Sequence, residues 1–178
     1  MLIAGLAIGC ARPVEKPSPK KQEEKVQIKQ LKPEEYPVPE KLKEVLPGLL
    51  NDKIRIWREI SPTINLVAYI ENYSLEKAIK LCAHAFMVLL EKPEFKKDIQ
   101  FWIIQIQPRE RENPEILVWG VRPSEAEEYK QTGDLEKFFV NSEYVLINDM
   151  IIEKGNERLK HFPKTLKKQS QQPSQPSK

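Results

Sequence analysis

Residues 74–91 have the sequence SLEKAIKLCAHAFMVLLE, which predicts the central helix of the protein. Ser74 is a good N-cap, because its hydroxyl can accept hydrogen bonds from the free N–H groups of the first turn. Pro93 marks the end of the helix. At about 100° per residue, the apolar side chains fall within about 120° of arc and form one stripe that must face a core. These are Leu75, Ala78, Ile79, Cys82, Phe86, Leu89 and Leu90.

The segments on either side of this helix predict strands, because apolar residues alternate with polar ones or form short bounded runs. The predicted strands are 54–60, 63–70, 100–107, 115–121 and 143–152, of which the last could also begin a helix. Shorter helices are predicted over 41–50 and 123–130, and a helical turn over 135–140. We therefore expect an α+β fold, a single small domain with a mixed or antiparallel sheet of about five strands and helices packed on one face.

The composition divides the 178 residues into four parts. Residues 1–9 are apolar and resemble the core of a signal peptide. Residues 10–40 form a linker rich in Pro, Lys and Glu, and residues 161–178 form a basic tail rich in Gln, Ser and Pro. Both are expected to be disordered, because they bury too little apolar surface to offset chain entropy. Residues 41–160 then form the α+β globular domain.

The net charge of +3 is unevenly distributed. Residues 160–178 contain five Lys and no acid, and residues 11–40 carry +1, so the body of the protein is mildly acidic. A nucleic-acid-binding domain concentrates basic side chains on its folded body. We therefore expect no nucleic-acid partner.

The first residues point to the cell envelope. Leu6-Ala7-Ile8-Gly9-Cys10 ends an apolar run too short to cross a bilayer, which takes about 20 residues. This segment resembles the lipobox of bacterial lipoproteins, and the resemblance covers these residues only. It implies diacylglyceryl transfer to the Cys10 thiol, cleavage before Cys10 and acylation of the new amino group, which would anchor the protein to a membrane. Ala11 after the cysteine, in place of Asp, implies the outer membrane if the cell has two.

Three tryptophans are candidate ligand-binding residues. Trp57, Trp102 and Trp119 fall on three different predicted strands. Aligned on one exposed face, they would form a stacking platform for sugar rings or a peptide. The ordinary alternative is that they lie in the core.

Asp149, Arg109 and Arg111 are the other candidate binding residues. In a strand over 143–152, Asp149 would share a face with apolar residues and would need a partner or a raised pKa. It could also lie on the solvent side or in a bend. Arg109 and Arg111, in a charged loop between two strands, could clamp a carboxylate or phosphate. They alternate with Glu110 and Glu112, so local ion pairs are the alternative.

The remaining polar residues favour structural roles. His84 is expected to face solvent with no nucleophile beside it, and His161 lies next to the tail. Glu125, Glu127 and Glu128 suit the start of a helix, where acids are favoured. Cys82 is expected to act as a small buried hydrophobe. The sequence contains no nucleophile elbow, phosphate loop or zinc motif, so we expect no cofactor, no metal and no catalytic residue.

These observations lead to three hypotheses. The first is a membrane-anchored envelope lipoprotein whose tethered domain mediates contacts with a protein or the cell wall. The second is a periplasmic or surface protein that binds a small ligand, or hydrolyses it, with Asp149 or a tryptophan-lined cleft. The third is a cytosolic α+β domain with an incidental apolar N-terminus.

Overall fold

The computed structural model describes residues 32–60, 62–109 and 115–169. Cys10, the expected leader and most of the expected linker lie outside this range, as do Arg111 and the end of the tail. The helices and strands in chain order are β1 (Glu34–Pro37), α1 (Glu40–Val45), β2 (Lys53–Ile56), β3 (Thr63–Ile70), α2 (Leu75–Leu90), the 3-10 helix η1 (Pro93–Phe95), β4 (Phe101–Pro108), β5 (Leu117–Val121), α3 (Pro123–Thr132), α4 (Leu135–Asn141), β6 (Tyr144–Ile147), β7 (Met150–Ile151), α5 (Asn156–His161) and α6 (Lys164–Gln169).

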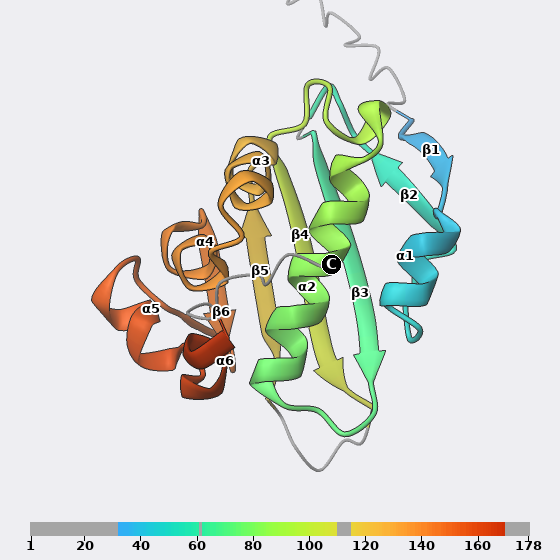
Figure 1. The fold of residues 1–178 in the computed structure, drawn as a ribbon. Coiled ribbons are helices and arrows are strands. Elements are labelled where there is room, and N and C mark those ends of the chain that lie inside the picture. Colours follow the sequence, from blue (N-terminus) through green and yellow to red (C-terminus); the bar gives the residue numbers. More distant parts are fainter. Residues whose placement is uncertain (1–31, 61, 110–114, 170–178) are drawn as a thin grey trace, which may run out of the picture. The chain divides into compact units, whose positions relative to one another are not determined.

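The expected α+β fold is confirmed. Five strands form one mixed sheet in the order β3-β4-β5-β6-β7. The pair β3 and β4 is parallel, and each later pair is antiparallel. The parallel pair requires a crossover, which the central helix α2 provides (Figure 1).

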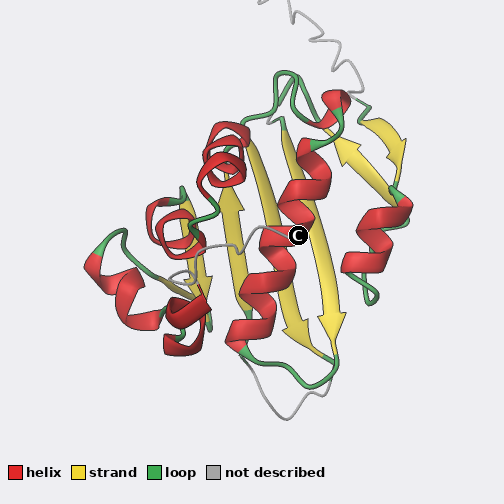
Figure 2. Ribbon diagram, viewed as in Figure 1, coloured by secondary structure: helices red, strands yellow, loops and turns green. Residues whose placement is uncertain are grey.

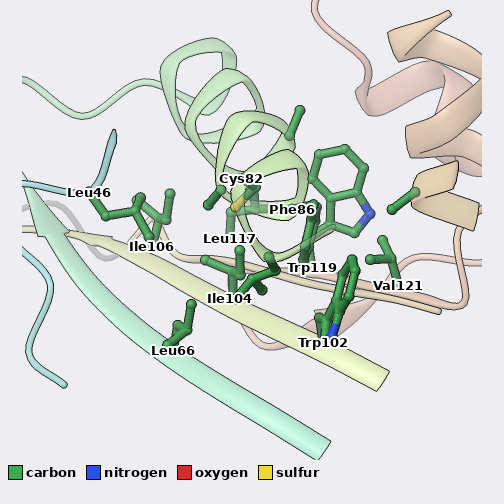
Figure 3. Close-up of a cluster of buried hydrophobic side chains, with 14 of the residues drawn as sticks. Leu46, Leu66, Cys82, Phe86, Trp102, Ile104, Ile106, Leu117, Trp119 and Val121 are labelled. Atoms are coloured by element: carbon green, nitrogen blue, oxygen red, sulfur yellow. The ribbon is translucent and has the colours of Figure 1, made fainter. Parts of the chain in front are cut away.

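Helix α2 begins and ends where the sequence predicts. The Ser74 hydroxyl accepts a hydrogen bond from the backbone N–H of Lys77 at 3.2 Å. Its apolar stripe packs on β4 and β5, and α3 and α4 lie beside it on the same side of the sheet (Figures 1 and 2). Phe86 lies at the centre of this core, with its ring centroid 6.4 Å from that of Trp102 and 5.4 Å from that of Trp119 (Figure 3).

The folded part begins earlier than expected, within the segment assigned to the linker. Strand β1 pairs antiparallel with β2 in a second, two-stranded sheet. The Glu35 carboxylate binds Lys53 and Arg55 of β2, and Tyr36 packs edge-on against Phe95. The strand expected over 54–60 is therefore shorter and belongs to this small sheet.

The folded part also extends past residue 160. The side chains of Phe162 and Leu166 are buried, and Phe162 packs on Phe139 of α4. The start of the expected tail is therefore part of the domain.

Residues 143–152 form strands, as favoured, but not one continuous strand. Strands β6 and β7 pair antiparallel, with Ile147 opposite Met150, so Asn148 and Asp149 make a two-residue turn. Both turn residues have positive φ, 53° and 62°, which is the conformation that a tight hairpin with right-twisted strands requires.

Candidate functional site

The two faces of the main sheet are covered differently. Side chains that point toward α2 are buried, whereas the alternate positions are half-buried or exposed, except Gly120. We call this second surface the open face. It comprises Thr63, Asn65, Val67, Tyr69, Phe101, Ile103, Gln105, Gln107, Val118, Gly120, Tyr144, Leu146 and Ile151.

Apolar side chains form a row across the middle of the open face. The strand register places Val67, Gln105, Val118, Leu146 and Ile151 side by side, one from each strand. Gln105 is the only polar member of this row. The row ends in Ile151, whose exposed fraction is 71%.

Leu50 extends this row beyond the edge of β3. Its backbone N–H donates to the carbonyl of Val67 at 2.8 Å, and Leu49 forms a bridge with Ala68. Because Ala68 belongs to the buried face, Leu50 lies on the open one. Its exposed fraction is 56%, so both ends of the row present large apolar side chains to solvent.

None of the strand residues that define the open face is charged. Charged side chains adjoin its ends. Arg122 stacks over the Phe101 ring at 5.6 Å and pairs with Glu143 at 3.1 Å, and Arg109 pairs with Glu71 at 3.0 Å. A solvated sheet face usually alternates with charged and polar residues. A face without charged strand residues and with a mostly apolar row is typical of a surface that binds another molecule.

The parallel pair strengthens this interpretation. Parallel strands are nearly always covered on both faces. Strands β3 and β4 are covered on one face by α2, and no helix of the described residues covers the other. Tyr69 at the end of β3 has an exposed fraction of 37%.

The outer edge of β3 is already occupied. The carbonyl of Gly48 accepts from the Tyr69 N–H at 2.9 Å, and Asn51 binds both the N–H of Val67 and the carbonyl of Asn65. A Cβ at Gly48 would lie 1.8 Å from the Tyr69 oxygen, so only glycine allows this approach. A partner therefore has access to the face, and not to this edge.

A groove of about 630 Å³ adjoins the open face where β3 ends. Val45, Leu49 and Leu81 supply apolar walls, and Tyr69 belongs to both surfaces. Charged side chains lie at its rim: Arg109 binds the Glu71 carboxylate, Lys77 donates to the Glu71 backbone carbonyl at 2.7 Å, and Glu44 also lines the groove. The groove therefore combines apolar walls with a charged rim next to the open face.

The tryptophans do not form a platform. Trp102 and Trp119 are fully buried, and their indole N–H groups donate to the Phe95 carbonyl and the Ser142 hydroxyl, at 2.7 and 2.8 Å. Trp57 lies just past β2, with an exposed fraction of 42%. The structure therefore contains no tryptophan-lined cleft in its described part, and the ordinary interpretation holds for two of the three residues.

The other candidate residues lie apart from one another. Asp149 is exposed in the turn between β6 and β7, so it needs no buried partner. Arg109 is exposed and pairs with Glu71, as the local-pairing alternative expects, although the acid is not one of its neighbours in the loop. Arg111 and Cys10 lie outside the described residues.

His84, Cys82 and Glu125 lie where the sequence predicts. His84 is exposed on α2. Cys82 is completely buried among apolar side chains (Figure 3), and this burial raises the pKa of its thiol well above the ordinary value. A thiol held in its protonated form is a poor nucleophile. Glu125 caps α3, because its carboxylate accepts from the backbone N–H of Arg122 at 2.8 Å.

The sequence analysis did not single out the open face. The sequence does contain an indication of this face in strands 63–70 and 100–107, where Val67, Phe101 and Ile103 make the second face partly apolar.

Arg158 was not predicted either. It is a buried guanidinium that donates to the carbonyls of Ile152, at 2.9 Å, and of Ser142. Through these hydrogen bonds Arg158 holds α5 against the end of the sheet, so its role is structural.

Two further observations concern the described residues as a whole. They contain no group of three or more His, Cys, Asp or Glu side chains placed to hold a metal ion. None of their helices is both long enough and apolar enough to span a bilayer. Comparison with protein families, with curated proteins and with solved structures finds no match to this chain.

Proposed function

We propose that this chain is an envelope-anchored binding protein, whose folded domain binds another protein through the open face of its sheet. The observation that carries the proposal is the uncharged, half-apolar surface over the parallel pair β3 and β4. Burying such a surface against a partner removes apolar groups from water, which stabilises the complex by about 25 cal/mol per Å², and the strand residues of the face carry no charge to desolvate.

The membrane anchor is argued from the sequence. It is supported by the likeness of Leu6–Cys10 to a lipobox and by the Pro, Lys and Glu composition that follows. Two acyl chains on Cys10 would hold the protein on a membrane. The residues between Cys10 and β1, if extended, would let the domain reach roughly 70 Å from the bilayer. A domain held in this way can search for a partner within the envelope.

Acyl labelling tests the anchor. The full-length chain is expressed in a bacterial host with radiolabelled palmitate, beside the variant Cys10→Ala. We expect label in the unaltered chain and none in the variant, because Cys10 is the proposed acceptor. Equal labelling of the two chains would refute the anchor.

Site-specific photocrosslinking tests the face. A photoreactive amino acid replaces Ile103 in the middle of the open face or, as the matched control, His84 on the exposed side of α2. We expect protein adducts from position 103 in living cells and few from position 84. The proposal is wrong if the two positions give the same adducts or if position 103 gives none.

A further inference from the structure

We infer that the surface formed by residues 154–169, which include α5 and α6, binds the anionic headgroups of a lipid bilayer. We call this surface the basic end. The inference rests on the proposed function, because the proposed anchor brings the domain to a bilayer. It concerns a different surface from the open face.

The charge of the folded part is divided between two regions of opposite sign. Residues 154–169 contain six basic residues and one acid, which gives a net charge of +5. Residues 32–153 contain sixteen basic and twenty-two acidic residues, which gives −6. A charge separation of this size draws an anionic surface toward one end of the domain. The basic residues of this end are Lys154, Arg158, Lys160, Lys164, Lys167 and Lys168.

The basic end is a fixed part of the fold. Phe162 packs on Phe139 of α4 with the ring centroids 5.6 Å apart, and Leu166 is buried as well. The buried Arg158 holds the segment through hydrogen bonds to backbone carbonyls. Because the apolar side of the segment is turned inward, its lysines are presented to solvent. The exposed lysines are Lys154, Lys160 and Lys164.

These lysines are free to contact a headgroup. Lys164 makes no ion pair within the described residues. Lys160 pairs with Glu157, one turn earlier, and both side chains are more than half exposed. Lys154 lies 3.4 Å from the Glu143 carboxylate, also at the surface. Exposed pairs of this kind contribute little to stability, so they exchange readily for a phosphate.

The residue types of the basic end favour lipid headgroups over nucleic acid. Surfaces that bind nucleic acid combine their positive charge with exposed arginines or aromatic rings, which read the bases or stack on them. Here Arg158 and Phe162 are both buried, which leaves lysines and His161 at the surface. Lysine is a compact point charge on a flexible stem, and this suits fluid headgroups that have no fixed geometry.

The segment between the proposed anchor and the domain supplies a further argument for a membrane. Residues 11–31 contain six basic residues and three acids, a net charge of +3, and they directly follow Cys10. Basic segments next to a lipid anchor bind anionic bilayers more strongly with each added Lys or Arg. The basic end would add its charge to this segment and determine which side of the domain faces the bilayer.

Attachment through the basic end leaves the open face accessible. Helices α5 and α6 lie beside α4 on the β6 side of the main sheet, whereas β1 and β2 lie on the β3 side (Figure 1). The Thr165 hydroxyl of α6 donates to the Glu76 carboxylate in the first turn of α2. The basic end therefore packs on the helical side of the sheet, and the open face is the opposite side. A domain held in this way can still bind a protein through the open face.

Sedimentation with lipid vesicles tests the inference. The full-length chain bearing Cys10→Ala is used, because it cannot carry the proposed acyl anchor. Vesicles of phosphatidylcholine mixed with phosphatidylglycerol are compared with vesicles of phosphatidylcholine alone, which measure any contribution of the apolar residues 1–9. We expect at least tenfold tighter binding to the anionic vesicles. High salt should remove this difference, because it screens exposed charges.

Two double variants locate the effect on the surface. Lys160→Gln with Lys164→Gln removes two positive charges from the basic end. Lys92→Gln with Lys97→Gln removes two exposed charges beyond the other end of α2. We expect the first pair to weaken binding to the anionic vesicles at least fivefold and the second pair less than twofold. Thermal unfolding verifies that both variants are folded.

Three outcomes would overturn the inference. They are equal binding to the two kinds of vesicle, equal weakening by the two double variants, and tighter binding to a DNA duplex than to anionic vesicles at the same phosphate concentration. Any of these removes the role of the basic end alone, because the chain used has no anchor. The proposed function fails separately, if the unaltered chain takes up no palmitate and position 103 gives no crosslink.

Discussion

The indole N–H of Trp119 donates to the hydroxyl of Ser142 at 2.8 Å, and both groups are buried. The same hydroxyl donates to the carbonyl of Phe139 at 3.0 Å. Ser142 therefore connects the central strand β5 to the end of α4, and it allows a tryptophan to lie in an apolar core without an unpaired donor. These two hydrogen bonds fix how the helical layer meets the sheet at β5.

Ser142→Ala tests the connection. Removal of the hydroxyl leaves the Trp119 N–H without its partner, and an unsatisfied buried donor costs about 1–3 kcal/mol. We expect the free energy of unfolding, measured with urea, to fall by that amount. Ser124→Ala on the exposed surface of α3 is the control and should change it by less than about 0.5 kcal/mol. Equal effects would mean that the Trp119 bond contributes nothing.

The two glycines next to the open face lead to a second prediction. A Cβ at Gly48 would meet the backbone oxygen of Tyr69 at 1.8 Å, whereas a Cβ at Gly120 would meet the side-chain Cδ1 of Tyr144 at 2.7 Å. A ring can turn away, but a strand cannot move without breaking its hydrogen bonds. We expect Gly48→Ala to cost about 3 kcal/mol or more and Gly120→Ala about 1 kcal/mol, both by urea unfolding. The reverse order would contradict the proposed approach of Gly48 to β3.

Much of the fold could be predicted because its main signals are local. Residues 63–70 have an apolar side chain at every second position and residues 74–91 have a helical stripe, and both elements lie where these periods place them. The turn at Asn148 and Asp149 was missed inside an apolar run, although both residue types tolerate a positive φ and are typical of hairpin turns.

Strand β1 could not be predicted, because what holds it is distant in sequence. Glu35 pairs with Lys53, 18 residues later, and Glu34 with Arg58, 24 residues later. Its proline-rich surroundings resemble a linker in composition. The open face could not be predicted for a different reason. In residues 101–104 both alternate faces are apolar, so this half of the strand does not indicate whether Trp102 or Ile103 points inward.

The ion pairs between the two carboxylates of β1 and nearby Lys and Arg side chains lead to a pH-dependent prediction. Hydrogen bonds from Arg58, then Tyr36, lower the pKa of Glu34, and those from Lys53, then Arg55, lower the pKa of Glu35. Because the pKa values of these carboxyl groups are lower in the folded state, the ionised carboxylates stabilise the folded state above the ordinary value of 4.5. This stabilisation is lost as the pH falls through the pKa values of the folded state. We expect amide protection of β1 in hydrogen exchange to fall as the pH drops below the ordinary value of 4.5, before that of β3 and β4.

The variant with both Glu34→Gln and Glu35→Gln is the control for this pH effect. It should show weak protection of β1 already at neutral pH and little further change on acidification, since its side chains no longer titrate. If β1 and the main sheet lose protection together in the unaltered chain, the carboxylates do not control the attachment of β1.

The last prediction concerns Tyr73, the residue before the N-cap of α2. Its hydroxyl is buried and has no hydrogen-bond partner within the described residues. Burial, followed by the nearby Glu115 carboxylate, raises the pKa of this phenol far above its ordinary value of 10. A raised folded pKa means that the folded state favours the neutral phenol, so this stabilisation is complete below pH 10 and is lost as the pH rises through the folded value.

Tyr73→Phe removes a buried hydroxyl that makes no hydrogen bond within the described residues. We expect its free energy of unfolding at neutral pH to be unchanged or higher by up to about 1 kcal/mol, because the cost of desolvating the hydroxyl disappears. The matched variant Tyr36→Phe loses the hydrogen bond to Glu34, 2.8 Å long, and should be slightly destabilised. A clear loss of stability in Tyr73→Phe would show that the hydroxyl has a partner and would contradict this interpretation.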